Sequence, residues 1–328
     1  MLRLFIFFIL ISLPSAIYAA DSDFKIWLEC FKKEAIAQKI SRSTVDMALN
    51  NIRALPTVVK QKNNQPEVQK TLEQYLNDAI NEYRIRKGKK LLRQHQPLLD
   101  NIYQKYAVAP HYIVALWAME SDFGRITGKT PVIQALVTLA WRGRRSNYFR
   151  QELLNALHII DKGLIPLTSM RGSWAGAMGQ VQFMPSTFLL FAVDGNNDGL
   201  IDLWNTEADC LCSAANYLAK LGWKGQQLWG REVQLPPGFT SEQIKFKQQM
   251  KLTRWHKLGI RKVDGTDLPH SAMLASLVQP DGSTGRSFLV YNNYRTILKW
   301  NRSHKFAIAV GLLANFIGEK TVHANTTK

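Results

Sequence analysis

The chain has 328 residues, of which 46% are hydrophobic and 20% are charged. This composition is typical of globular proteins and excludes a disordered chain, and the length suits one large domain, alone or with smaller attachments. Beyond the first 20 residues, no apolar run is long enough to cross a bilayer. The net charge of +17 favours anionic polymers as partners through long-range attraction.

Residues 1–20 have the pattern of a secretory signal peptide. Arg3 precedes an apolar run over residues 4–13, and the small residues Ala19 and Ala20 mark the expected cleavage point. A membrane anchor is the alternative, but the run is short for a bilayer span. No cysteine stands at the exit of the run, so the sequence does not indicate lipid attachment.

Cleavage at this point predicts a periplasmic protein with no transmembrane segment in its mature form. It removes Arg3 and no acidic residue, which leaves a net charge of +16. Export argues against nucleic acid as the partner. We therefore expect anionic polymers of the cell envelope, and the sequence leaves peripheral association with the outer membrane open.

The first third of the mature chain is predicted to be helical. Apolar residues recur every three or four positions along residues 24–35, 45–52 and 72–83, as one buried helix face requires. The basic run 84–90 interrupts this pattern. We interpret it as a solvated turn between helices, and a grip on an anionic polymer is the alternative.

The rest of the chain predicts more helices and one small sheet. Helices are expected across residues 98–222, and the Thr130–Pro131 pair has the form of a helix start. Short apolar stretches at 273–278 and 287–291, set between glycines and prolines, predict strands. A closing helix is expected from about 303 to 316. The fold class is therefore mainly α (α+β), with a small β insert.

The three cysteines do not form a disulfide framework. Their odd number excludes complete pairing within the chain. If residues 207–221 are helical, Cys210 and Cys212 point to different faces and cannot readily bond to each other. We expect these two and Cys30 to be buried free thiols.

Glu120 is the strongest candidate for chemistry. It comes near the end of the stretch 113–124, which is apolar on all sides and therefore reads as a buried helix. Burial and the negative end of the helix dipole both favour the protonated carboxyl that a general acid needs. The alternative is a glutamate paired with one of the many arginines. No Ser/His/Asp or Cys/His arrangement stands out in the sequence.

Residues 172–186 form a glycine-rich segment with polar and aromatic side chains between the glycines. Ser173 and Gln182 offer hydrogen-bonding groups, and Trp174 and Phe183 offer faces on which a sugar can stack. Glycines let a backbone approach a flat ligand closely. A tight loop with aromatic residues in the core is the competing interpretation.

Residues 194–209 resemble a calcium-binding loop. Asp194, Asn196 and Asp198 place oxygen ligands at alternate positions, as in the opening of an EF-hand. The glutamate that closes an EF-hand is missing, so Glu207 or Asp209 would have to close a longer loop. Asp209 could instead form a capping box with Thr206. We favour a weak, structural calcium site over a solvated turn.

Together these segments resemble the membrane-bound lytic murein transglycosylase B family, glycoside hydrolases that cleave peptidoglycan glycan strands. The resemblance runs from Phe24 to about Phe316. It is most specific in residues 117–124, 172–186 and 194–217. It implies a lysozyme-like helical core. The expected divisions are a signal peptide (1–20), a helical N-terminal domain (21–97), a catalytic core (98–225), a β-containing subdomain (226–302), and a C-terminal helix and tail (303–328).

The resemblance also implies roles for individual residues. Glu120 is implied to be the sole catalytic acid and base. The implied substrate-binding residues are Ser173, Gln182 and Tyr217 along the sugar cleft, with Phe183 as a stacking face, and Arg144 and Arg145 near the muramoyl peptide. The implied calcium ligands are Asp194, Asn196, Asp198 and Asp209, with the backbone carbonyl of Leu200. Position 300 departs from the family, because Trp300 stands where a tyrosine is usual.

The implied reaction needs one carboxylate and no cofactor. An ordinary glycosidase needs a second carboxylate, whereas a lytic transglycosylase uses the C6 hydroxyl of muramic acid as nucleophile and leaves a 1,6-anhydro product. The alternatives are a hydrolytic muramidase on the same fold, with Asp122 as the second carboxylate, and a non-catalytic wall-binding protein. Peptidoglycan strands are the expected partner, and proteins of wall synthesis are implied by the resemblance alone.

Overall fold

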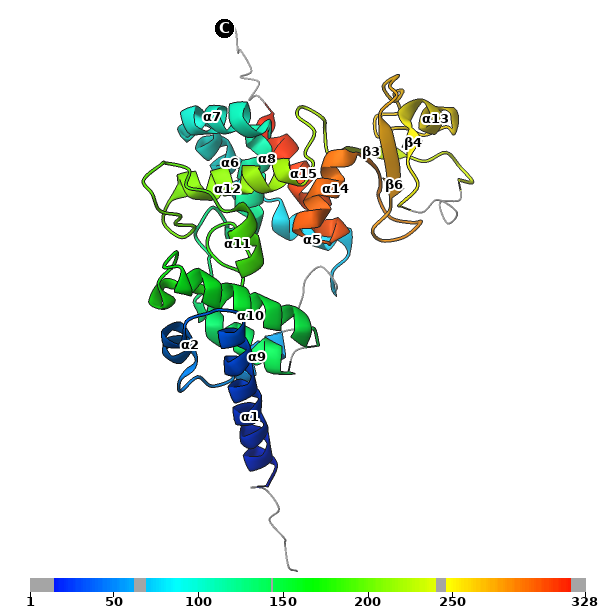
Figure 1. Cartoon of the computed structure of the whole chain (residues 1–328). Helices are drawn as coiled ribbons and strands as arrows, with labels where there is room; N and C mark the ends of the chain where they lie inside the picture. The colour runs from blue at the N-terminus through cyan, green and yellow to red at the C-terminus, as the bar shows by residue number, and fades with distance from the viewer. Residues whose placement is uncertain (1–14, 62–68, 143, 240–245, 320–328) are drawn as a thin grey trace, which may run out of the picture.

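The computed structural model describes residues 15–61, 69–142, 144–239 and 246–319 (Figure 1). The apolar run 4–13 of the predicted signal peptide lies outside these residues. Within the described ranges, no helix combines the length and the apolarity needed to span a membrane.

Two groups of helices form most of the molecule. The lower group in Figure 1 consists of α1 (Ser15–Ala37), α2 (Arg42–Leu49), α3 (Pro56–Gln61), α9 (Val132–Arg142) and α10 (Ser146–Asp161). The upper group consists of α5 (Leu72–Ala79), α6 (Glu82–Gln94), α7 (Gln96–Tyr106), α8 (Pro110–Ser121), α12 (Glu207–Lys220), α14 (Asn292–Trp300) and α15 (His304–Gly318). The short helix α11 (Pro185–Phe191) packs against both α10 and α12, and so connects the groups.

Helix α8 lies at the centre of the upper group. It packs against α6, α7, α12 and α15, and its residues from Tyr112 to Ala118 are all buried. A helix that is apolar on every side is stable only when other elements surround it. The sequence-based expectation of a buried helix before Glu120 is therefore confirmed.

Local sequence explains where several helices begin. Ser41 caps α2 by accepting from the Thr44 amide, and Thr71 and Gln74 form a capping box at the start of α5. Ser303 caps α15 by accepting from the Phe306 amide. These side chains satisfy backbone N–H groups that have no partner within the helix.

A small antiparallel sheet forms the lobe beside α14. Its strands lie in the order β4 (Met250–Lys251), β6 (Leu274–Val278), β7 (Ser287–Val290), β3 (Gly230–Gln234) and β5 (Arg261–Lys262). The short helix α13 (Leu252–Lys257) accompanies this sheet (Figure 1). The lobe has its own hydrophobic core, in which Leu252, Trp255 and Tyr291 are fully buried. The predicted fold class is confirmed, while the predicted domain boundaries stay predictions.

Two local expectations were wrong. Residues 84–90 are helical within α6, because Gly88 serves packing rather than a turn: a Cβ at this position would lie 2.5 Å from Cδ1 of Ile317 on α15. Thr130 does not cap a helix. It lies in β1 (Thr130–Pro131), paired with β2 (Arg171–Gly172), and α9 begins only at Val132.

Candidate active site

Glu120 lies in the last turn of α8 and is half-buried. The indole Nε1–H of Trp300, at the C-terminal end of α14, donates to its Oε1 atom at 2.7 Å. The structure thus joins two residues that are 180 positions apart in the chain. Position 300 departs from the family and lacks a hydroxyl, and its indole nevertheless contacts the predicted acid.

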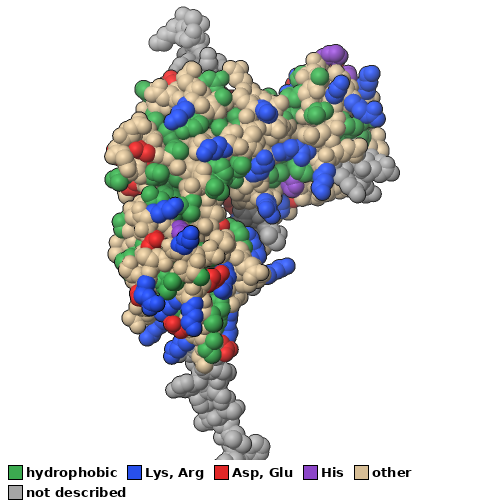
Figure 2. Space-filling view, viewed as in Figure 1, with side chains coloured by type: hydrophobic (Ala, Val, Ile, Leu, Met, Phe, Trp, Pro, Cys, Tyr) green, Lys and Arg blue, Asp and Glu red, His purple; other side chains and the backbone are tan. Residues whose placement is uncertain are grey.

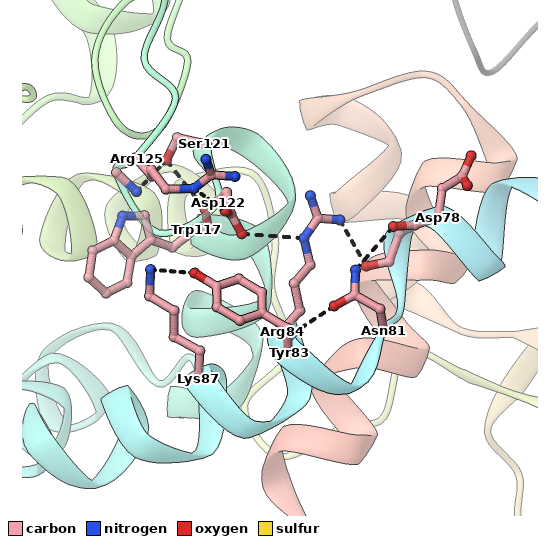
Figure 3. Close-up of polar contacts among 11 residues, drawn as sticks. Asp78, Asn81, Tyr83, Arg84, Lys87, Trp117, Ser121, Asp122 and Arg125 are labelled. Atoms are coloured by element: carbon pink, nitrogen blue, oxygen red, sulfur yellow. Dashed lines mark hydrogen bonds and ion pairs between the residues drawn. The ribbon is translucent and has the colours of Figure 1, made fainter.

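Helix α8 ends through three successive residues in the left-handed region, Asp122, Phe123 and Gly124, with φ angles of 51°, 60° and 81°. This reversal directs the buried Asp122 carboxylate toward α6. Nε of Arg84 on α6 lies 3.5 Å from one of its oxygens, and Nε of Arg125, in the turn after α8, lies 2.7 Å from the other. Figure 3 shows Asp122 between these two arginines. The carboxylate nearest to Glu120 in sequence is therefore committed to a salt bridge.

Three aromatic rings pack together next to Glu120. The Trp300 ring centroid lies 4.8 Å from that of Tyr217 and 5.3 Å from that of Phe183. Tyr217 is buried, which raises its pKa to about 12, and its hydroxyl donates to the carbonyl of Lys299 at 2.7 Å. We call Phe183, Tyr217 and Trp300 the aromatic cluster. Sugar contact by Tyr217 and Phe183 stays a prediction, because the contacts seen here stabilise the cluster itself.

The glycine-rich segment is folded back on itself. Ser173 Oγ accepts from the Ala177 amide at 3.1 Å, and the Gln182 side chain donates to the carbonyls of Thr127 at 3.1 Å and Gly179 at 2.7 Å. Gly179 has a φ of 67°, and a Cβ there would lie 2.4 Å from the Leu203 carbonyl oxygen. These contacts fix the loop, and the roles of Ser173 and Gln182 toward sugar stay predictions.

Arg144 and Arg145 are exposed where α10 begins. The Arg145 guanidinium lies 4.3 Å from the centre of the Tyr148 ring. Partial burial and then the charge of Glu152 raise the pKa of Tyr148 to about 12, whereas the charges of Arg145 and Arg302 act to lower it. Arg302 lies two residues after Trp300 of the aromatic cluster. The basic pair Arg144–Arg145 therefore lies near Tyr148 and Arg302.

Two functional side chains were missed by the sequence analysis. Glu152 of α10 is buried and accepts from both the amide and the hydroxyl of Ser186, at 2.9 and 2.6 Å, which fixes the start of α11. Gln180 is also buried and bonds to Trp117 of α8. Glu152 gave no signal beyond an acidic residue in a helical pattern, and Gln180 directly follows Gly179 in a segment that resembled a loop.

In the predicted calcium loop, the carboxylates accept hydrogen bonds from backbone amides of the loop. Asp194 accepts from the amides of Asn197 and Gly199, at 2.7 and 2.8 Å, and Asp198 accepts from the amide of Leu200 at 2.8 Å. Asp209 accepts from the amides of Gly195 and Asp202, both at 2.7 Å. Thr206 makes no side-chain cap for α12, so Asp209 forms no capping box with it, and the Asp209 carboxylate instead binds amides of the loop.

The electrostatics of the loop fit a cation. Asp209 is 1% exposed; its pKa is raised by burial and further by the charges of Asp194 and Asp198. Three mutually repelling carboxylates that offer oxygen donors suit Ca²⁺. The described residues, however, hold no group of three or more His, Cys, Asp or Glu side chains at metal-binding spacing, and loop amides donate to the carboxylates of Asp194 and Asp209. The ligand set therefore stays a prediction.

Comparison with known proteins identifies the class of protein. The family model for the transglycosylase SLT domain matches residues 23–315, so the chain belongs to this family of lytic transglycosylases. Within it the chain is of the type represented by membrane-bound lytic murein transglycosylase B of Escherichia coli (strain K12), with which it is 34% identical over 252 residues. That alignment covers 74% of this chain and 66% of the relative, just under two thirds of its length.

Solved structures agree with this placement. SltB3 from Pseudomonas aeruginosa, in complex with NAG-anhNAM-pentapeptide, is 42% identical with a TM-score of 0.84, and the match covers 90% of this chain and 80% of that one. Escherichia coli Slt35 in complex with calcium is 29% identical with a TM-score of 0.75, covering 88% of this chain and 92% of that one. The predicted family and the enzyme class are confirmed.

Proposed function

We propose that this lytic transglycosylase cleaves the β-1,4 bond between N-acetylmuramic acid and N-acetylglucosamine in peptidoglycan and leaves 1,6-anhydromuramoyl ends. Glu120 is the single acid and base. The observation that carries the proposal is the contrast between two carboxylates: Glu120 accepts an indole N–H beside the aromatic cluster, whereas Asp122 is held between Arg84 and Arg125.

In the first step, the Glu120 carboxyl donates its proton to the glycosidic oxygen, and the bond from that oxygen to C1 of the muramic acid breaks. In the second step, the Glu120 carboxylate takes the proton from the C6 hydroxyl of the same sugar while that oxygen bonds to C1. The carboxyl is thereby restored for the next cycle. Because the nucleophile is already part of the substrate, its effective concentration is high and no second carboxylate is needed.

Basic side chains support binding of an anionic glycan–peptide. Arg144 and Arg145 stand exposed near Tyr148, where they can pair with carboxylates of the stem peptide. Figure 2 shows Lys and Arg side chains on this face from the lower helices to the sheet lobe, with acidic side chains interspersed among those of the lower helices. SltB3, the similar protein from P. aeruginosa, was crystallised with NAG-NAM-pentapeptide. This chain is proposed to bind the same class of substrate.

Asp194, Asn196, Asp198 and Asp209, with the carbonyl of Leu200, are proposed to hold a structural Ca²⁺. The calcium complex of Slt35 supports this proposal, as does the mutual repulsion of the loop carboxylates. The ion would neutralise these carboxylates and stiffen the segment between α11 and α12. It would take no part in the chemistry at Glu120.

The chain is proposed to act in the cell envelope. The signal-peptide pattern of residues 1–20 and the relative described as membrane-bound support this location. Within the cell envelope, the finer alternatives are periplasmic release, peripheral contact with the outer membrane and association with wall-synthesis proteins.

Replacing Glu120 with glutamine tests the catalytic assignment. The variant keeps the shape and the acceptor oxygen for Trp300 but can neither donate nor take up the proton. We expect an unchanged melting temperature and at least about a hundredfold loss of lysis of purified cell walls. Glu82→Gln, at an exposed position on α6, is the matched control and should retain full activity. Retained lysis by Glu120→Gln would place the acid elsewhere.

A further inference from the structure

Trp300 contacts Glu120 through its indole N–H, which can act only as a hydrogen-bond donor. An indole N–H donates a hydrogen bond and accepts none, and a bond to an ionised carboxylate is stronger than one to a neutral carboxyl. At 2.7 Å from Oε1, the indole therefore fixes one oxygen of Glu120 in both protonation states.

The indole itself is held from several sides. Its ring packs against Tyr217 and Phe183, and the Tyr217 hydroxyl binds the carbonyl of Lys299, the residue just before Trp300. On the other side, the Asn301 amide donates to the Ile297 carbonyl, and Asn301 Oδ1 accepts from the Ser303 amide. These bonds fix the backbone around position 300. The donor cannot swing away without breaking the aromatic cluster.

We propose that Trp300 is a positioning residue, which selects the rotamer in which Glu120 meets the substrate. The proposal rests on the proposed function, because it concerns the way Glu120 is presented to the substrate. A carboxyl group that rotates freely would spend part of its time with neither oxygen aimed at the scissile bond. Small misplacements of a catalytic group are costly in rate.

The arrangement also links the sheet lobe to the acid. Trp300 ends α14, and α14 follows directly from β7 in the chain. Tyr217 lies on α12, and Phe183 belongs to the glycine-rich segment. The position of Glu120 thus depends on three parts of the chain that meet at one ring. None of these contacts requires Trp300 to touch a sugar.

The test compares Trp300→Phe with Trp300→Tyr, two variants that differ by one hydroxyl group. Each is assayed on purified glycan strands for kcat and KM, with melting temperatures measured alongside. Loss of a hydrogen bond to a charged group predicts a kcat about tenfold lower or more in Trp300→Phe, with KM changed less than about twofold. Trp300→Tyr carries an O–H donor and should recover most of the lost kcat.

Trp223→Phe is the matched control. It also removes an indole hydrogen bond, to the Gly225 carbonyl, in a ring that packs on Tyr112 away from the aromatic cluster, and it should leave kcat unchanged. If Trp300→Phe does not fold, Tyr217→Phe replaces it. That variant frees the Lys299 carbonyl while keeping Trp300, and a smaller fall in kcat with unchanged KM is expected.

Two outcomes would overturn the proposal. Equal kcat values for the wild type, Trp300→Phe and Trp300→Tyr would show that the donor has no positioning role. A raised KM with unchanged kcat would make Trp300 a sugar platform instead. Failure of the proposed function looks different, because the wild type itself would then release no anhydro products or Glu120→Gln would stay active.

Discussion

The indole Nε1 of Trp117 donates a hydrogen bond to Oε1 of Gln180 at 2.8 Å, and both side chains are buried. The amide nitrogen of the same Gln180 side chain donates to the Trp204 carbonyl at 2.9 Å, and its backbone N–H donates to the Leu203 carbonyl at 2.7 Å. One glutamine therefore links α8, the glycine-rich segment and the predicted calcium loop. These are the three segments in which the family resemblance is most specific.

This network predicts a large effect of Gly124→Ala. Gly124 has a φ of 81°, and an added Cβ would lie 2.4 Å from Gln180 Oε1, so the substitution both strains the backbone and displaces the acceptor of Trp117. We expect a loss of about 3 kcal/mol in the free energy of unfolding, measured by urea denaturation.

Gly163→Ala is the control for backbone strain alone. Its φ is 66°, but nothing lies within 4 Å of the added Cβ. A loss of about 1 kcal/mol is expected from the left-handed conformation. Equal losses for the two variants would show that the Gln180 network contributes nothing to stability.

Calcium is predicted to raise the melting temperature, and Asp198→Ala should abolish the rise. The effect should also depend on pH. Because burial and the neighbouring carboxylates raise the pKa of Asp209, the folded protein holds this proton to higher pH than the unfolded chain does. Without calcium, Asp209 therefore makes the free energy of unfolding fall as pH rises from the ordinary pKa of an aspartate to the raised pKa of the folded protein.

A bound cation favours the ionised form of Asp209, so the calcium-induced rise should be larger at neutral pH than at acidic pH. Differential scanning fluorimetry with calcium and with a chelator measures both effects. Asp264→Ala, in the loop between β5 and β6, is a control that should leave the rise intact. No calcium-dependent shift in the intact protein at neutral pH would refute the site.

Asp122→Asn is predicted to lower stability without changing the product. Removing one partner of a buried ion pair leaves an uncompensated arginine and typically costs about 3 kcal/mol. Arg84 is the buried partner here, since Arg125 is mostly exposed. Products from the folded variant should still be anhydro forms, which chromatography of digests can establish. A switch in product identity would make Asp122 part of the chemistry.

The cysteines are predicted to differ in reactivity toward iodoacetamide in the native protein. Cys30 is exposed, which corrects the expectation that all three thiols are buried. Cys210 and Cys212 are buried, and burial raises the pKa of Cys212 to about 11 and that of Cys210 further. Peptide mass mapping after brief labelling at pH 8 should find modification at Cys30 alone. Labelling of Cys210 at the same rate would contradict the structure.

The sequence predicted the features that depend on local pattern. Residues 113–119 are apolar on all sides, which indicated a buried helix and made Glu120 a candidate, and short apolar stretches between glycines and prolines indicated the strands β6 and β7. It erred where tertiary packing overrides local propensity. The basic run 84–90 was expected to be a turn, yet it is helical, and Gly88 within it leaves room for the side chain of Ile317 on α15.

Long-range partners at the site could not be predicted in the same way. The bond between Trp300 and Glu120 and the one between Trp117 and Gln180 join segments far apart in the chain, and no periodicity signals such pairs. Asp122 follows Glu120 by two residues, and on a continuing helix its side chain would point away from that of Glu120. The structure adds the reason, because the left-handed end of α8 turns its carboxylate to Arg84 and Arg125.

The most direct test of the central claim is the mass of the muropeptides that the mature protein releases from purified sacculi, with Glu120→Gln run alongside. The account predicts products one water lighter than those of a hydrolytic muramidase, released by the wild type and absent with the variant. Hydrated products would contradict it, because water rather than the C6 hydroxyl would then be the nucleophile.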